Sequence, residues 1–148
     1  MRRVLSVPQS KMNKKDSLEF LPSNYRHEKI FLSRANLDNW HDLSKLTDSR
    51  INKIIHLDQL CTESRLKKIR VIAKLILGLD ISPAQAYILL HSGINSVKAL
   101  SILDPYILEK KIGRLQRNLN IKIHTNITLK LLNNWITKAK HLDKVDLF

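Results

Sequence analysis

The chain has 148 residues, of which 43% are hydrophobic and 26% charged, and it contains only three glycines and four prolines. This composition indicates a packed globular body rather than a disordered chain, and it favours helices over strand-rich folds, which need many tight turns. Lysine and arginine number 26 against 13 acidic residues, so the net charge of +13 attracts phosphate polymers and anionic surfaces. A lysine-rich proteome would produce the same charge without such a partner.

Residues 1–20 are polar and basic, and we predict that they form a flexible tail. From Leu21 onward the pattern is helical. The first helix opens at Leu21-Pro22-Ser23, where proline suits a first helical turn, and Asn36 ends it. Two further helices are predicted to begin at the capping residues Asn39 and Thr47, followed by a long helix over residues 63–77 that ends at Gly78.

The second half of the chain begins with a stronger helix-start signal. Ser82-Pro83-Ala84-Gln85 combines a capping box with proline at the first helical position. Gly93 is the expected left-handed stop, and Ser96 caps a short helix. Asp104 precedes a helix that runs to about Leu119, and a last helix is predicted over about residues 126–141.

The two halves repeat one another when the chain is shifted by 57 residues. Apolar positions coincide, and so do the residues that start and stop helices. The matched pairs include Leu32 with Leu89, Trp40 with Val97, Leu43 with Leu100, Asn36 with Gly93, Asn39 with Ser96, and Thr47 with Asp104. We therefore predict an all-α fold with two tandem units in a compact helical domain, residues 21–78 and 79–142.

Residues 90–100, LHSGINSVKAL, resemble the hairpin of helix-hairpin-helix domains. A wider stretch, from Leu21 to about Lys140, is similar to a cyanobacterial family of unknown function that pairs two such units, each followed by a helical segment. The matching pieces are LPSNYR (21–26), CTE (61–63), LKKIR (66–70), LHSGI (90–94), GRLQR (113–117) and WI (135–136). The resemblance implies a fold and carries no known activity.

In the wider helix-hairpin-helix class, the backbone N–H groups of a Gly-aliphatic-Gly turn hold a DNA phosphate at a helix N-terminus. The corresponding turn here, Gly93-Ile94-Asn95, lacks the second glycine. The other two turns place Asp38 and Asp80 where a phosphate would lie. A phosphate contact at Gly93 and Asn95 therefore remains open, and the competing interpretation is that Gly93 only ends a helix.

Basic side chains line one face of each of two predicted long helices. At 100° per residue the opposite faces are apolar, and no acidic residue lies within either basic stripe. The stripes occupy segments that we expect to be equivalent in the repeat, which favours a phosphate-binding surface over an ordinary solvated face. Their members are Lys67, Arg70 and Lys74 in the first helix, and Lys110, Lys111, Arg114 and Arg117 in the second.

Other kinds of chemistry lack support in the sequence. The six histidines show no metal-ligand spacing, and there is no glycine-rich phosphate loop and no catalytic triad pattern, so we predict neither enzymatic activity nor a cofactor or metal. Trp40 and Trp135 have the spacing of core residues, which argues against a base-stacking platform. Any binding is then expected to involve the nucleic-acid backbone.

The single cysteine, Cys61, excludes an internal disulfide, and we expect it to be a reduced thiol. The longest nearly apolar stretch, residues 71–79, contains Lys74 and is too short to span a bilayer. Arg2 and Arg3 precede no apolar segment of signal-peptide length. We therefore predict a cytoplasmic protein that does not insert into membranes.

These observations lead to a non-enzymatic protein that binds DNA or structured RNA, without sequence specificity, through its basic helix faces. The alternative is a helical module that binds an acidic protein partner without contacting nucleic acid. A third, weaker interpretation is peripheral contact of the basic tail with anionic membranes, although the tail lacks the bulky apolar face that such contact usually needs.

Overall fold

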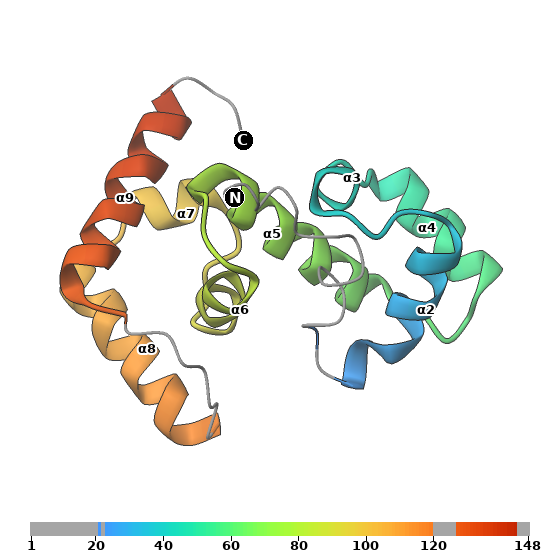
Figure 1. Ribbon diagram of the computed structural model, residues 1–148, viewed down its shortest axis with the longest axis horizontal. Coiled ribbons are helices and arrows are strands. Elements are labelled where there is room, and N and C mark those ends of the chain that lie inside the picture. The colour runs from blue at the N-terminus through green and yellow to red at the C-terminus, as the bar shows by residue number, and fades with distance from the viewer. Residues whose placement is uncertain (1–20, 22, 120–126, 145–148) are drawn as a thin grey trace, which may run out of the picture. The chain divides into compact units, whose positions relative to one another are not determined.

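The computed structural model describes residues 21, 23–119 and 127–144, and over these residues the chain folds into helices with no strand (Figure 1). This confirms the all-α prediction, whereas the predicted tail over residues 1–20 lies outside the described residues. The helices are η2 (Ser23–Tyr25, a 3-10 helix), α2 (Arg26–Arg34), α3 (Trp40–Ser44), α4 (Asp48–Leu57), α5 (Glu63–Leu79), α6 (Pro83–His91), α7 (Val97–Ser101), α8 (Pro105–Leu119) and α9 (Leu129–Lys144).

The chain divides into two compact units, Met1–Arg70 and Val71–Phe148, and the division falls inside α5. The sequence-based division between residues 78 and 79 follows the punctuation at Gly78 instead. Because α5 is one continuous helix, its first turns belong to the first unit and its last turns to the second.

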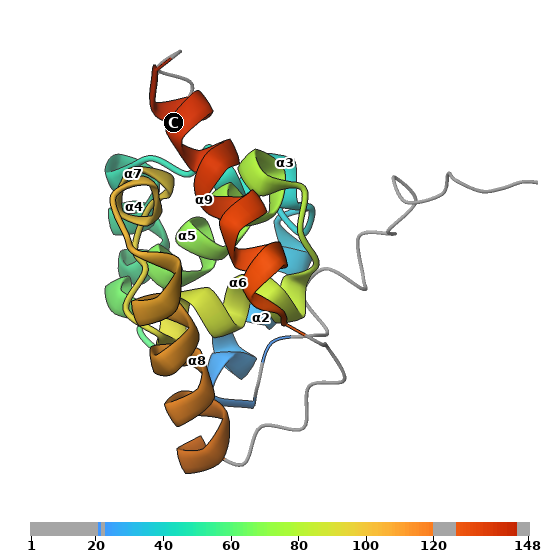
Figure 2. The same cartoon turned by 90° about the vertical axis from the view of Figure 1, so that its left-hand side faces the viewer.

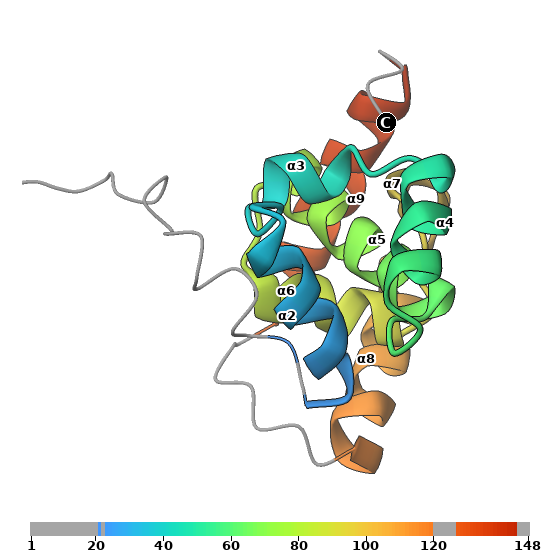
Figure 3. The same cartoon turned by 90° about the vertical axis from the view of Figure 1, so that its right-hand side faces the viewer.

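In the first unit, α2, α3 and α4 surround the first turns of α5 (Figure 3). A buried acid joins two of these helices. The Glu28 side chain on α2 has no exposed surface, and its carboxylate accepts hydrogen bonds from the Thr62 backbone N–H at 2.8 Å and from Arg65 Nε at 3.2 Å. The apolar core around them includes Tyr25, Leu32, Leu43, Ile51, Ile54, Leu66 and Ile69.

In the second unit, α9 packs along α7 and α8, and α6 contacts α8 (Figure 2). Lys138 on α9 donates a hydrogen bond to the carbonyl oxygen of Leu79 at 2.9 Å, which satisfies one of the unpaired carbonyls at the end of α5. The core includes Ile72, Leu75, Ile88, Leu89, Leu100, Leu108, Leu132 and Ala139. The packing of α9 on α8 leaves the opposite side of α8 exposed to solvent.

The predicted helix starts at four capping residues are confirmed, whereas the last helix, predicted over about residues 126–141, begins at Leu129 and ends at Lys144. Asn39, Thr47 and Ser96 each accept a hydrogen bond from the backbone N–H three residues later. The Ser82 and Gln85 side chains form the reciprocal bonds of a capping box, at 3.2 and 3.0 Å. The caps form as predicted because each depends only on neighbours within one helical turn.

One predicted helix end is wrong. Gly78 does not stop the long helix, which continues to Leu79, and Asp80 adopts the left-handed conformation instead with φ 56°. Leu79 and Ile81 are both buried, so continuing the helix through Gly78 places two apolar side chains in the core. This burial outweighs the helix penalty of one glycine, about 1 kcal/mol.

The repeat extends to individual hydrogen bonds. Asn36 and Gly93 both have positive φ, 59° and 96°. The residue after each donates its N–H to a carbonyl five positions back, from Leu37 to Leu32 at 2.8 Å and from Ile94 to Leu89 at 3.0 Å. The Ser44 hydroxyl donates to His41 O, and at the equivalent positions the Ser101 hydroxyl donates to Lys98 O. Both helix ends therefore close in the same way.

Candidate functional site

Helix α8 carries the second basic stripe on its solvent-exposed side. Asp104 caps the helix by accepting the Tyr106 N–H at 2.8 Å, and Pro105 occupies the first helical position. Leu108 and Ile112 are buried and fix which side of the helix faces the core. The opposite side presents Lys110, Arg114 and Arg117, and the exposed Lys111 lies beside them; we call these four cations the α8 basic face.

The cations of the α8 basic face form no ion pair with any carboxylate among the described residues. Gly113 lies on the same side of the helix, and a Cβ atom placed there would be 3.4 Å from a terminal guanidinium nitrogen of Arg117. The Arg117 side chain therefore lies over the Gly113 backbone. Because these charges are not neutralised by described acids, they are available to an anionic ligand.

The first basic stripe, on α5, was predicted to contain cations that no acidic residue neutralises, and two of its three members differ from that prediction. Lys67 Nζ lies 2.8 Å from a carboxylate oxygen of Glu63, and this hydrogen bond raises the pKa of Lys67. Arg70 Nη1 lies 2.8 Å from Asp48 Oδ1 and also donates to the Leu46 carbonyl oxygen at 3.0 Å. The prediction that no acid neutralises this stripe is therefore wrong, because Asp48 approaches from a different helix.

The third member, Lys74, is exposed and forms no ion pair with a described residue. One unpaired lysine remains on the predicted α5 stripe, against four unpaired cations on the α8 basic face.

The two stripes are also not equivalent in the repeat. A shift of 57 residues carries α4 onto α8, and it carries residue 63, where α5 begins, to residue 120, whereas α9 begins only at Leu129. The residue equivalent to Lys110 is therefore Lys53 on α4. The expected equivalence of the stripes is wrong because the counterpart of α8 is α4, which precedes α5, so the α5 stripe corresponds to residues beyond α8.

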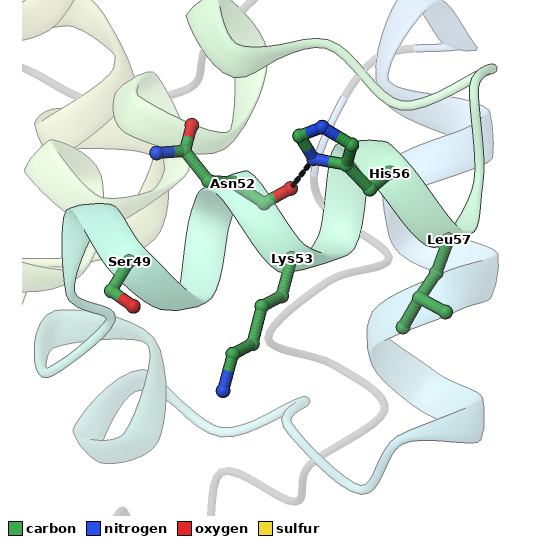
Figure 4. Close-up of a pocket in the computed structure, with 5 residues that line it drawn as sticks. All are labelled: Ser49, Asn52, Lys53, His56 and Leu57. Atoms are coloured by element: carbon green, nitrogen blue, oxygen red, sulfur yellow. Dashed lines mark hydrogen bonds between the residues drawn. The ribbon is translucent and has the colours of Figure 1, made fainter.

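The exposed side of α4 is the natural comparison for the α8 basic face, and its residues line an open pocket (Figure 4). His56 is held by a 2.7 Å hydrogen bond between its Nδ1 atom and the Asn52 carbonyl oxygen, so part of this surface is internally satisfied. The five lining residues are Ser49, Asn52, Lys53, His56 and Leu57, and they correspond to Tyr106, Glu109, Lys110, Gly113 and Arg114. Most of the positive charge on the α8 basic face is thus specific to the second unit.

Residues 22–142 match the family described as Domain of unknown function (DUF4332). The chain belongs to this family. The match covers helices α2 to α8 and most of α9, so the α8 basic face lies inside the DUF4332 domain. Comparison with curated proteins and with solved structures gives no match. The description of DUF4332 names no activity, and the helix-hairpin-helix resemblance remains a prediction.

The Gly93 turn of the DUF4332 domain uses its backbone to close α6. The Gly93 N–H donates to Leu90 O and the Ile94 N–H to Leu89 O, both at 3.0 Å. These two N–H groups are occupied within the protein, which favours Gly93 as a helix stop over a phosphate-binding turn. Asn95 is exposed beside them, and a contact between Asn95 and a phosphate stays a prediction.

An exposed aromatic residue escaped the sequence-based prediction. Trp40 and Trp135 are buried, 6% and 3% exposed, as their spacing indicates. Tyr106, however, is 63% exposed and precedes Lys110 by four residues, about one helical turn. Placing α8 on a helical wheel with Leu108 and Ile112 inward would have revealed it, because Tyr106 then falls on the outer side.

Within the described part of the DUF4332 domain, no group of three or more metal-ligating side chains occurs. Among the same residues, no helix has the length and apolar character needed to cross a membrane. Cys61 is buried, and burial raises the pKa of its thiol from 9.0 to about 11. Its Sγ atom donates to the His27 carbonyl oxygen at 3.7 Å, so the described contacts of this thiol are structural.

Proposed function

We propose that this protein binds nucleic acid without catalysis, through the α8 basic face. The observation that carries the proposal is the set of four exposed cations on one helix, none of which is paired with a described carboxylate. Cations that a fold leaves unpaired together create a local positive potential, and phosphate polymers respond to it strongly.

The spacing of the cations suits a sugar-phosphate backbone. At 1.5 Å rise per residue, Lys110 and Arg114 are separated by about 6 Å along the helix, and Lys110 and Arg117 by about 10 Å. Their long side chains can therefore reach successive phosphates. Arginine guanidinium groups bind phosphate through two parallel hydrogen bonds, so Arg114 and Arg117 would orient the strand. Such contacts read no base sequence.

The Gly93 turn serves a structural role in this proposal. It ends α6 and leads into α7, which packs with α8 against α9 in the same unit. The turn thereby helps to position α8, and phosphate binding depends on side chains.

A pair of charge reversals on equivalent helices tests the proposal. Lys110→Glu with Arg114→Glu should weaken binding to labelled DNA and structured RNA by at least about tenfold at low salt. Arg50→Glu with Lys53→Glu on α4 changes the net charge equally and should have a much smaller effect. Circular dichroism checks that both variants stay folded. Equal losses in the two variants, or no binding by the wild type at low salt, would contradict the proposal.

A second candidate function is docking of an acidic protein surface. Exposed apolar side chains at the start of α8 and just before it, Ile107 and Ile102, favour this candidate, because protein interfaces combine apolar contacts with charge. Affinity capture from nuclease-treated lysate separates the two functions. A direct protein partner is retained after nuclease treatment, whereas proteins bridged by nucleic acid are lost.

A further inference from the structure

The outer side of α8 combines charge with an aromatic ring. With 100° per residue, Tyr106, Lys110 and Arg117 fall within about 40° of one another, on the side opposite Leu108 and Ile112. Tyr106 donates its backbone N–H to Asp104, but its ring is 63% exposed. The ring therefore lies at the N-terminal end of the α8 basic face.

The repeat shows that the helix itself does not require this ring. Ser49 occupies the equivalent position on α4, which is capped by Thr47 where α8 is capped by Asp104, and the matched residues Ile51 and Leu108 are both buried. Nor does the Tyr106 hydroxyl form a hydrogen bond with another described residue. A tyrosine that is largely exposed and whose hydroxyl bonds no described residue can contact a ligand.

Gly113 has no side chain and lies between Tyr106 and Arg117 on the outer side of α8. It lies seven residues after Tyr106, three after Lys110 and four before Arg117, so all four share one side of the helix. A Cβ atom placed at Gly113 would be 3.4 Å from a guanidinium nitrogen of Arg117. The equivalent residue on α4 is His56, a bulky side chain. Unlike α4, α8 therefore carries no bulky side chain of its own at this position, next to its cations.

We propose that Tyr106 stacks against an unpaired nucleobase while Lys110, Arg114 and Arg117 hold the adjoining phosphates, so that α8 prefers single-stranded segments to duplex. Bases in a duplex are already stacked on their neighbours and cannot lie on a protein ring, whereas unpaired bases can. Charge alone would favour the duplex, whose phosphate density is higher. This inference rests on the proposed function and names its ligand class, which differs from the sequence-based expectation of backbone binding alone.

Variants of Tyr106 test the inference against single-stranded and duplex DNA of one sequence. Tyr106→Ala should weaken single-strand binding about 5- to 100-fold and duplex binding less than about twofold, because one base-aromatic stack is lost. Tyr106→Phe should retain single-strand affinity. Tyr106→Leu keeps an apolar side chain without a ring, and it should behave like Tyr106→Ala. Full single-strand affinity in Tyr106→Leu would overturn stacking and indicate a general apolar contact, as in protein docking.

Different results would contradict base stacking by Tyr106 and nucleic-acid binding by the α8 basic face. If Lys110→Glu with Arg114→Glu weakens binding while Tyr106→Ala leaves single-strand affinity unchanged, stacking is wrong and the proposed function stands. If the wild type binds neither single strands nor duplex at low salt, both are wrong.

A fluorescent reporter gives an independent measurement. Since both natural tryptophans are buried, Tyr106→Trp adds an exposed indole that an oligonucleotide can reach. Saturating single-stranded DNA should quench the emission of Tyr106→Trp and leave that of the matched variant Ser49→Trp on α4 nearly unchanged. Equal quenching of the two variants, or none at saturation, would overturn the inference.

Discussion

The guanidinium of Arg70 bridges Asp48 and the Leu46 carbonyl oxygen, with its Nη1 atom 2.8 Å from Asp48 Oδ1 and 3.0 Å from Leu46 O. It thereby ties α5 to the start of α4 and to the turn that precedes it. Asp48 is largely exposed, so the ion pair itself contributes little. The bond to the carbonyl satisfies a part-buried backbone group, and this commits Arg70 to the structure of the first unit.

Charge reversal should therefore destabilise the protein at Arg70 and leave its stability nearly unchanged at Lys110. Arg70→Glu removes the carbonyl's donor and places a carboxylate beside Asp48, so we expect a loss of about 1 to 3 kcal/mol in the free energy of unfolding. Lys110→Glu should change stability by less than about 0.5 kcal/mol, because surface substitutions usually do. Urea denaturation measures both changes in stability, and nucleic-acid titration measures the loss of binding that we expect for Lys110→Glu. A strong loss of binding in folded Arg70→Glu would show that α5 also contributes to the interface.

Glu28 should be the acidic residue on which the first unit most depends. Glu28→Gln replaces a buried carboxylate that accepts from the Thr62 N–H and from Arg65 Nε, and it leaves Arg65 without its described ion-pair partner. We expect this to cost about 3 kcal/mol of unfolding free energy. Glu63→Gln breaks the exposed pair with Lys67 and should cost less than about 0.5 kcal/mol. Similar midpoints for the two variants in urea would contradict the structural role of Glu28.

The two matched helix stops, Gly93 and Asn36, should differ in how a substitution changes the stability of the protein. Gly93→Ala forces a side chain to φ 96°, and because no atom lies within 4 Å of the new Cβ, the cost is conformational, about 1 to 2 kcal/mol. Asn36→Gly at φ 59° should change stability by no more than about 0.5 kcal/mol, since glycine adopts this conformation freely. Thermal melting of both variants checks the pair. An unaffected Gly93→Ala would show that the left-handed stop is not required.

Cys61 should react slowly in the folded protein. With its pKa raised to about 11 by burial, the folded thiol is roughly 0.1% thiolate at pH 8, and alkylation by iodoacetamide should accelerate about tenfold per pH unit up to pH 10. In urea the same thiol should follow its ordinary pKa and react about a hundredfold faster at pH 8. Equal rates in the folded and unfolded chains would refute the burial of this side chain.

The same pKa shift has a consequence for stability. Because the unfolded chain releases the Cys61 proton near pH 9 and the folded chain near pH 11, stability should fall as the pH rises through this window. Cys61→Ala should lack this contribution, which denaturation at pH 8 and pH 10.5 would measure.

The salt dependence of the binding constant should report how many cations contact the phosphates of a strand. Four phosphate contacts predict that log K falls with log salt concentration with a slope of about −3 for single strands. Lys111→Gln should reduce the steepness by about 0.7, whereas Lys53→Gln should leave it unchanged. A slope much shallower than −3, or an equal effect of both substitutions, would show that the α8 basic face is not the main contact.

Local chemistry accounts for what could be read from the sequence. The caps at Asn39, Thr47, Ser82 and Ser96 and the stops at Asn36 and Gly93 depend on groups within one or two turns, so residue type and spacing predict them. The one failed stop, Gly78, is the case in which burial of Leu79 overrides a local preference.

Sequence alone predicts that this protein is helical, where most of its helices begin, and which side of α8 carries cations. Only the tertiary structure decided which cations remain unpaired, because Arg70 meets Asp48 and Arg65 meets Glu28 across 22 and 37 residues of chain. It likewise buried Glu28, whereas the exposure of Tyr106 follows from the helical pattern of α8. Ion pairing and burial depend on neighbours that are distant in sequence, and folding alone brings them together.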